Sequence, residues 1–250
     1  MRSRYPASSN FASSFGPGPL TPAIKAIVIV NVAAFLVSAI VPGMTLAFGL
    51  RPAAVLEGLQ VWQPVTYMFL HGGVFHLLFN MLALWMFGVE LERMWGSRYF
   101  TKFYFVAGVG AALTTLFLSF VPLPLASQLY NSWTIGASGA VYGVLLAYAL
   151  YFPNRPILIY FVFPIPAKYF VMIMGAMSLY SSMSAAGDGI AHWTHLGGLV
   201  AAYLYLKGGT RTSLMTELRY RLVKWRINRS RQRFDVYSGG RSNDINRRVH

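Results

Sequence analysis

The stretch AIKAIVIVNVAAFLVSAIVP, residues 23–42, is almost wholly apolar over 20 residues. An α-helix needs about 20 residues to cross a hydrocarbon layer of roughly 30 Å. The stretch therefore predicts a membrane-spanning helix. No small-residue cleavage site follows it convincingly, so it is expected to be retained rather than removed as a signal peptide.

Further apolar blocks of similar character follow at 74–92, 99–121, 136–153, 168–184 and 189–207. The composition supports the same class, because 56% of the residues are hydrophobic and 11% are charged, whereas soluble domains carry about 25% charged residues. The six blocks predict an all-α, polytopic membrane protein with six transmembrane helices. Segment 154–167 is also apolar, but it holds three prolines, which favours an interfacial connection over a seventh span.

The basic residues are distributed unevenly between the two sides of the predicted membrane. With the N-terminus inside, the inner side carries 20 of the 21 Lys and Arg residues, all except Arg51. Inner loops of membrane proteins carry an excess of Lys and Arg. The net charge of +14 therefore predicts an orientation with both termini in the cytoplasm, and not a nucleic-acid-binding protein.

Three regions are expected along the chain: a flexible cytoplasmic arm at 1–22, a membrane core at 23–207 and a basic cytoplasmic tail at 208–250. In the tail, Leu214, Leu218, Leu222 and Trp225 recur at helical spacing among basic residues. This pattern is typical of an amphipathic helix held at a membrane surface by anionic lipid. Disorder is expected after residue 229.

The polar residues inside the apolar blocks are the candidates for function, because polar side chains are expensive at membrane depth. His76 and Asn80 lie four residues apart in the second block, so they share one face of a helix. Ser138 and Tyr142 share a face of the fourth block in the same way. The sixth block contributes His195.

Small residues indicate how these blocks could pack. Gly139 and Gly143 form a GxxxG pair in the fourth block, and Gly198 with Ala202 forms a similar pair in the sixth. Such pairs allow helix backbones to approach closely. If these two faces meet, the backbones that carry the candidate serine and histidine come together.

A serine beside a histidine base is an activated nucleophile, because the histidine takes the hydroxyl proton as the serine attacks a carbonyl. Nearby donors such as His76 and Asn80 can stabilise the oxyanion that develops. The alternative reading is structural, because an isolated GxSG sequence in a glycine-rich helix more often serves packing. His192 and His195 could bind a metal by their spacing, but no third ligand stands near them and Asp188 is the only nearby acid.

Several protease classes lack their residues in this sequence. The chain has no Cys, which excludes disulfides, thiol nucleophiles and thiolate metal sites. It has no HExxH motif for an intramembrane metalloprotease and no pair of membrane aspartates for an aspartyl protease. A serine mechanism is the class that the residues leave open.

The motifs resemble, in type and order, those of the rhomboid family of intramembrane serine proteases, over roughly residues 23–207. The second block matches the family patterns HxxxxHxxxN and GxxxExxxG, the fourth block matches GxSG in GASGAVYG, and THLGGL in the sixth block matches the AHxxG element. The matching residues are His71, His76, Asn80, Gly88, Glu92, Gly96, Ser138, His195 and Gly198. Thr194 stands where the family pattern has Ala.

The resemblance implies a rhomboid-like six-helix protease that cleaves peptide bonds in or near transmembrane segments of membrane proteins, without metal or cofactor. It implies Ser138 as nucleophile, His195 as general base and acid, and Tyr142 stacked on that base. The oxyanion hole would come from His76, Asn80 and the Ser138 N–H. The alternative in the same family is a catalytically silent protein that binds transmembrane helices.

The remaining family residues are expected to support the site or the fold. His71 is left open between a supporting and a structural role. Glu92 is expected to be a hydrogen-bond hub at the inner helix ends, and Gly139, Gly143 and Gly198 to pack helices. The compact six-span core suggests a bacterial plasma membrane.

Overall fold

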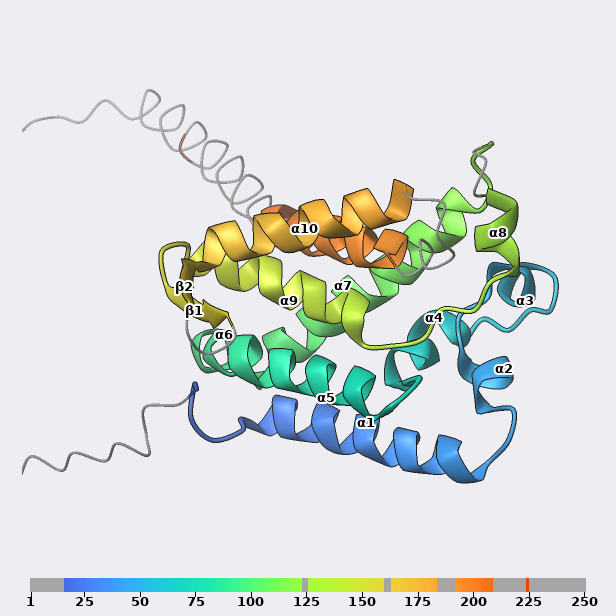
Figure 1. The fold of residues 1–250 in the computed structure, drawn as a ribbon, viewed down its shortest axis with the longest axis horizontal. Helices are drawn as coiled ribbons and strands as arrows, with labels where there is room; N and C mark the ends of the chain where they lie inside the picture. Colours follow the sequence, from blue (N-terminus) through green and yellow to red (C-terminus); the bar gives the residue numbers. More distant parts are fainter. Residues whose placement is uncertain (1–15, 123–125, 160–162, 184–191, 209–223, 225–250) are drawn as a thin grey trace, which may run out of the picture. The chain divides into compact units, whose positions relative to one another are not determined.

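The computed structural model describes residues 16–122, 126–159, 163–183, 192–208 and Lys224. Residues up to Leu206 belong to one compact unit, which is a bundle of helices (Figure 1). The chain from Lys207 onward forms a second unit, of which three residues are described. The predicted amphipathic tail helix therefore lies outside the described residues.

Three described helices are long and apolar enough to cross a membrane: α1 (Pro22–Ile40), the continuous helical segment Val74–Trp95 and α7 (Ser97–Leu118). Two shorter helices, α9 (Ser138–Tyr151) and α10 (Ala167–Met183), coincide with the fourth and fifth predicted blocks, and residues 192–206 are helical within the sixth. The fold is largely helical, as predicted. Six spans and the orientation of the termini stay predictions.

The second predicted span is a helix of three consecutive parts. It comprises α5 (Val74–Ala83), a π-helical turn η3 (Leu84–Gly88) and α6 (Val89–Trp95). Gly96 ends α6 and precedes α7 with φ +79°, a left-handed conformation that favours glycine. The chain therefore reverses between two long helices within a single residue.

Short elements connect the long helices at the end of the bundle where α9 begins. Between α1 and α5 lie α2 (Met44–Phe48), α3 (Pro52–Leu56), α4 (Gln63–Thr66) and the 3₁₀ turn η2 (Tyr67–Phe69), and α8 (Ala126–Asn131) follows α7. An isolated antiparallel bridge joins Leu50 to Thr134. The bridge ties the loop after α1 to the segment that leads into α9.

The connection from α9 to α10 corrects the all-α expectation. It forms a two-stranded antiparallel sheet of β1 (Pro156–Ile159) and β2 (Phe163–Pro166), in which Pro156 is opposite Pro166. Prolines lack the N–H that a helix requires, but they are tolerated on strand edges. The same prolines that argued against a seventh span therefore lead here to a hairpin.

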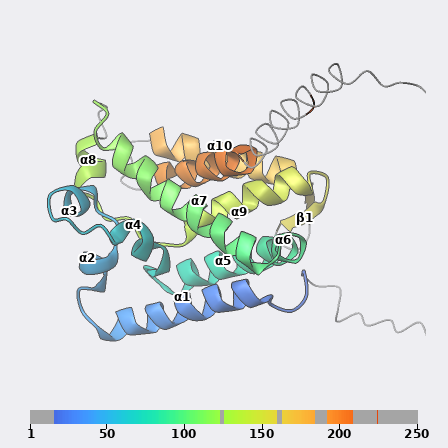
Figure 2. The ribbon, with the colours of Figure 1, turned by 180° about the vertical axis from the view of Figure 1, so that it is seen from behind.

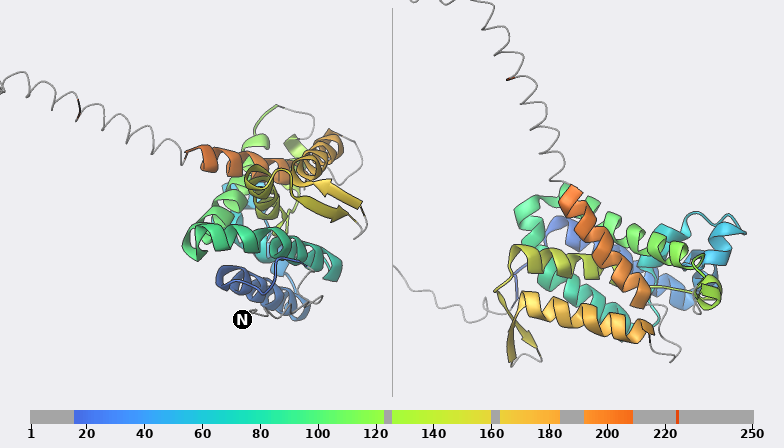
Figure 3. Two further views of the ribbon diagram at one scale, coloured as in Figure 1. Left: turned by 90° about the vertical axis from the view of Figure 1, so that its left-hand side faces the viewer. Right: turned by 90° about the horizontal axis from the view of Figure 1, so that it is seen from above.

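Helix α9 occupies the middle of the bundle, with most of its residues buried. It packs against α7, α10 and the second helical segment, while α1 lies on the far side of α5 (Figure 1). Seen from behind, α7 crosses α9 (Figure 2). The helix at 192–206 lies beside α10 and α7 (Figure 3).

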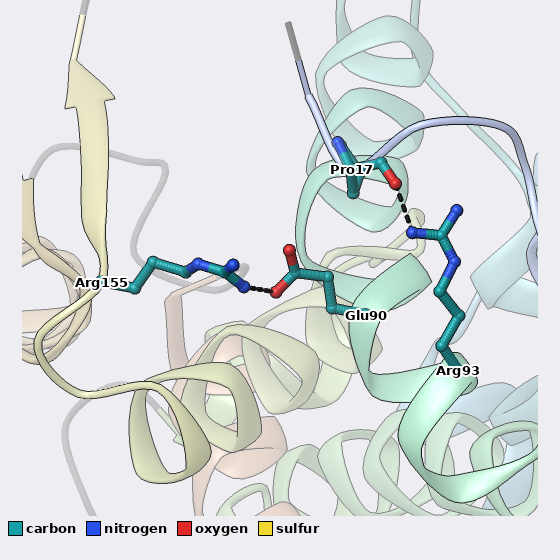
Figure 4. A network of polar contacts seen from close by, with 4 residues as sticks. All are labelled: Pro17, Glu90, Arg93 and Arg155. Atoms are coloured by element: carbon teal, nitrogen blue, oxygen red, sulfur yellow. Dashed lines mark hydrogen bonds and ion pairs between the residues drawn. The ribbon is translucent and has the colours of Figure 1, made fainter. Parts of the chain in front are cut away.

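The end of the N-terminal arm contacts the second helical segment, and the flexibility predicted for residues 1–22 stays a prediction. Trp85 Nε1 donates to Gly18 O (2.8 Å), and Arg93 Nη1 donates to Pro17 O (2.5 Å). Figure 4 shows Arg93 on Pro17, beside the ion pair of Arg155 with Glu90. Residues 17–19 make defined contacts because Trp85 and Arg93 donate hydrogen bonds to their carbonyls. Residues 1–15 lie outside the described residues.

Glu92 connects the beginnings of two long helices. Its buried carboxylate accepts hydrogen bonds from Ala23 N (2.8 Å), Ile24 N (3.0 Å) and Ser97 Oγ (2.6 Å), and also from the Thr21 hydroxyl. The first N–H groups of a helix have no partner within the helix, and a carboxylate is favourable at this positive end. Glu92 therefore caps α1 from a different helix.

Candidate active site

Ser138 and His195, which are 57 positions apart, meet inside the bundle. Ser138 is the first residue of α9, and His195 lies on the helix at 192–206. The His195 Nε2 and Ser138 Oγ atoms are 2.8 Å apart. This is the distance of a hydrogen bond between a serine nucleophile and a histidine base.

Glycine contacts bring these two backbones together. A Cβ added to Gly198 would lie 2.0 Å from Gly139 O, so the helix backbones touch there. A Cβ added to Gly143 would lie 2.6 Å from Ala107 Cβ and 3.1 Å from Ala202 Cβ. The small-residue faces predicted to meet do meet. Helix α7 is a third partner of the contact, which the sequence reasoning missed.

Tyr142 follows Ser138 by one helical turn and stacks on His195. The two rings are nearly parallel, at 5°, with centroids 4.4 Å apart. The His195 Nδ1 atom is buried and has no hydrogen-bond partner among the described residues. The stacked tyrosine ring therefore restricts the plane of the imidazole, in addition to the contacts of the imidazole with Ser138 and His192.

Ser178 on α10 donates a hydrogen bond to the Tyr142 hydroxyl (3.1 Å). Ser178 is itself buried. Sequence reasoning did not include this serine, because nothing in its neighbourhood matches a motif. Ser178 could have been found because it is a polar residue in an apolar block. Polar residues were considered as candidates in the second, fourth and sixth blocks but not in the fifth.

His76 lies beside the loop that leads into α9. Its Nε2 is 2.8 Å from the position that a Cβ on Gly136 would occupy, and Gly136 has φ +125°. The Gly72 N–H donates to His76 Nδ1 (3.3 Å), which leaves Nε2 on the side of Gly136 and Ser138. A side chain at position 136 would collide with this ring. Steric exclusion therefore explains why the first residue of GASG is glycine.

Asn80 is one turn beyond His76, and its side chain is buried. Its Nδ2 donates to His76 O (2.8 Å), four residues earlier in the same helix. An amide has two protons, so one remains for another acceptor. His76 and Asn80 lie on one face of the helix, as predicted. One of the two amide protons of Asn80 is already bonded to the helix backbone.

His71 packs behind His76, outside the helix that begins at Val74. It is buried, and its ring lies edge-on to that of His76 with centroids 5.0 Å apart. Burial, and to a lesser degree His76, lowers the pKa of His71 to about 4. The ring is therefore neutral near pH 7. His71 therefore lies where its ring can support the ring of His76.

His192 lies edge-on to His195 with ring centroids 5.6 Å apart. The described residues contain no group of three or more His, Cys, Asp or Glu that could hold a metal ion. Within that part of the chain the two histidines are therefore not joined by a third residue of these types.

A separate cavity of about 320 Å³ lies near the other end of α9, around Tyr148, Glu90 and Arg155. Tyr148 is ten residues beyond Ser138, which is about 15 Å along a helix. None of the residues predicted for catalysis lines this cavity. It belongs to the end of the bundle that holds the Arg155–Glu90 ion pair.

The fold and the site define an integral membrane protein, built as a helical bundle, in which a serine and a histidine meet between two helices. The family model of the Rhomboid domain matches residues 58–211, more than half of the chain. The chain belongs to the rhomboid family.

Several relatives share parts of the sequence. The Saccharomyces cerevisiae protein named Rhomboid protein 1, mitochondrial, is 34% identical over 138 residues, covering 55% of this chain and 38% of that protein. Rhomboid protease GluP of Bacillus subtilis is 37% identical over 99 residues, covering 40% and 17%. Rhomboid protease AarA of Providencia stuartii is 28% identical over 157 residues, covering 57% and 54%. The chain thus matches less than two thirds of each relative.

Proposed function

We propose that this chain is an intramembrane serine protease that hydrolyses peptide bonds in or near transmembrane segments of membrane proteins. The observation that carries the proposal is the 2.8 Å distance between Ser138 Oγ and His195 Nε2. Membership of a family that includes named proteases supports it.

In the proposed acylation step, the Ser138 hydroxyl attacks the scissile carbonyl while His195 Nε2 accepts the hydroxyl proton. A bond forms between Oγ and the carbonyl carbon. When the tetrahedral intermediate collapses, the carbon–nitrogen bond breaks and His195 returns the proton to the leaving amine. Water then hydrolyses the acyl-enzyme ester, with His195 first taking a proton from the water and then giving it to Ser138 Oγ.

The negative oxygen of the intermediate needs donors that are already in place. We assign this role to the Ser138 N–H, His76 and the second amide proton of Asn80. Ser138 begins α9, and the first N–H groups of a helix have no intrahelical partner and lie at its positive end. The Nε2 side of His76 adjoins Gly136 in the same loop.

Tyr142 takes the place of the orienting acid of a soluble triad. A stacked ring restricts the plane of the imidazole without adding a charge, which suits a low-dielectric site where an unpaired carboxylate is expensive. The hydrogen bond from Ser178 supports Tyr142 in turn. The orientation of the base would thus depend on contacts from both α9 and α10.

Substrates are proposed to be single-span or polytopic membrane proteins that approach past α10. The family resemblance assigns mobility to this fifth helix, and Phe170, Met172, Met174 and Met177 suit an adaptable face. Met172 and Met177 are 66% and 58% exposed.

The proposed topology places both termini in the cytoplasm, with the basic tail on anionic lipid. Because the relatives include a mitochondrial protein as well as bacterial ones, the bacterial plasma membrane stays a prediction.

The test compares purified wild type, Ser138→Ala and Ser132→Ala in liposomes containing a panel of single-span substrates. Wild type and Ser132→Ala should cleave at least one substrate and react with a fluorophosphonate probe, and Ser138→Ala should do neither. Cleavage by Ser138→Ala at the wild-type rate would refute the assignment of the nucleophile. Helix binding without cleavage by the wild type would instead support the silent alternative.

A further inference from the structure

Thr194 immediately precedes His195 and occupies a position where the rhomboid pattern has Ala. It is 1% exposed, and its Oγ1 lies 2.8 Å from Oγ1 of Thr115 on α7, which is fully buried. The sequence reasoning treated Thr194 as a neutral departure from the pattern. The contact gives it a specific partner on a helix that carries none of the proposed catalytic residues.

A second hydrogen bond of Thr115 identifies which threonine donates in the Thr194–Thr115 pair. Thr115 Oγ1 also donates to Ala111 O, one turn earlier in α7, at 3.2 Å. A threonine hydroxyl has a single proton. When both bonds form together, Thr194 therefore donates to Thr115, and Thr115 donates to the α7 backbone. The result is a short relay from the histidine-bearing helix to α7.

The contacts next to this pair are made by small residues, whereas Tyr205 meets Tyr99 and Phe103 further along the same two helices. A Cβ on Gly197 would lie 2.6 Å from Thr114 Cβ, and a Cβ on Gly110 would lie 2.3 Å from Ala201 Cβ. Small residues allow close approach, but their contacts are smooth and have little directional preference. A hydrogen bond between two buried hydroxyls has a preferred length and direction, so it can define the rotation and register of the helix.

The Thr194 side chain also reaches the nucleophile helix. A Cβ on Gly139, the residue after Ser138, would lie 3.5 Å from Thr194 Cγ2. The Thr194 hydroxyl is thus bonded to α7 while its methyl group lies over α9. Successive helical residues point about 100° apart, so a rotation that moves Thr194 also moves the His195 ring.

We propose that the Thr194–Thr115 hydrogen bond is a positioning element that holds the His195 imidazole on the Ser138 hydroxyl. The inference rests on the proposed protease function. Misplacing a catalytic group by about 1 Å can lower a rate by roughly a hundredfold. Loss of the bond, with the methyl group retained, should allow a smaller displacement and lower kcat about tenfold without changing KM.

The experiment measures kcat and KM in liposomes for Thr194→Val, Thr115→Val, the double variant and Thr194→Ser. Val keeps the branched shape without the hydroxyl, whereas Ser keeps the hydroxyl without the methyl group. Both Val variants should lose about tenfold in kcat, and the double variant should lose no more than either single one. Thr194→Ser should keep most of the wild-type kcat.

The matched control is Thr114→Val, which removes a neighbouring α7 hydroxyl that donates to Gly110 O on its own helix (2.9 Å). It should keep wild-type kcat. A wild-type kcat in Thr194→Val, additive losses in the double variant, or an equal loss in Thr114→Val would each overturn the positioning role. Thermal unfolding of every variant identifies a loss caused by misfolding, and Thr194→Ser then decides whether the hydroxyl matters.

Failure of the wider proposal has a different signature. A wild-type protein that cleaves nothing and leaves Ser138 unlabelled by a fluorophosphonate would overturn the protease function, and the positioning role with it. A wild type that cleaves normally beside an equally active Thr194→Val would overturn the positioning role alone.

Discussion

The two ends of the long helices use polar side chains in opposite ways. At one end, the Glu92 carboxylate accepts four hydrogen bonds and is almost fully buried. At the other, around Ser138, His195 and His192 each keep a buried ring nitrogen that has no partner among the described residues. Buried polar groups are normally paired. Among the described residues, the first end is therefore fully hydrogen-bonded at its central carboxylate, whereas the second retains unused hydrogen-bonding capacity on its histidines.

The largest effect should come from removing the proposed dyad. Ser138→Ala and His195→Ala should each lower kcat by about 10⁴-fold or more, and the double variant should be no worse, because residues that act as a unit are not additive. The unfolding temperature should change little. Single-turnover cleavage beside thermal unfolding measures both quantities. Independent, multiplicative losses would contradict a shared proton transfer.

The second prediction concerns the contact that joins the two helices. Gly198→Ala would place a methyl group 2.0 Å from Gly139 O, so the helices must separate, and the rate should fall about a hundredfold because the dyad is displaced by about 1 Å. Cleavage rate and unfolding temperature should fall together.

Gly175→Ala is the matched control for that prediction. Its added methyl group would meet Leu199 Cδ1 at 3.5 Å, an ordinary contact, and alanine is the better helix former. It should keep activity and unfold at the same or a higher temperature. If Gly198→Ala behaves in the same way, the close backbone contact does not position the dyad.

At the opposite end, Glu92→Ala should reverse the pattern seen for Ser138→Ala. It leaves the N–H groups of Ala23 and Ile24 without an acceptor, and each buried unpaired donor costs about 1–3 kcal/mol. The free energy of unfolding should fall by about 2–6 kcal/mol, while kcat per folded molecule stays near wild type. Equilibrium unfolding in detergent and active-site titration measure the two effects.

Glu90→Ala provides the comparison on the same helix. Glu90 pairs with Arg155, whose side chain is 47% exposed, and exposed ion pairs contribute about 0–1 kcal/mol. A loss as large as that of Glu92→Ala would show that charge in general, and not the capping of α1, stabilises this end.

The sequence was informative where a physical rule acts over a long stretch. Apolar length located the long helices, because crossing a bilayer sets a minimum length. Small-residue spacing and the GxSG and HxxG elements predicted which faces would meet, and Ser138 does lie against His195. The same rule would also have identified the Ala- and Gly-rich face of α7, which contains Ala107, Gly108 and Ala111. The rule was not applied to that helix.

What the sequence could not provide depends on side-chain rotamers across helices. The bond of Asn80 to the backbone, the support of Tyr142 by Ser178 and the pairing of Thr194 with Thr115 each need a rotation and a register that spacing alone does not define. The β1–β2 hairpin was missed for a related reason. Proline excludes a helix, but it does not say which alternative backbone replaces it.

The smallest predicted effect separates the two contacts of Tyr142. Tyr142→Phe keeps the stacked ring on His195 and loses the bond from Ser178, so kcat should stay within about twofold of wild type. Tyr142→Leu removes the stack as well. Aromatic pairs are worth about 0.5–1.5 kcal/mol beyond their buried area, which corresponds to a kcat lower by about two- to tenfold.

Tyr151→Leu on the same helix controls for the loss of an aromatic contact as such. Tyr151 packs edge-on against Trp95 with centroids 5.3 Å apart, at the end of α9 far from Ser138, so its replacement should change stability and not kcat. If Tyr142→Phe is as slow as Tyr142→Leu, the hydroxyl bond to α10, and not the stack, orients the base. The base would then depend on the position of α10, the helix past which the substrate is proposed to enter, and substrate binding could itself complete the site.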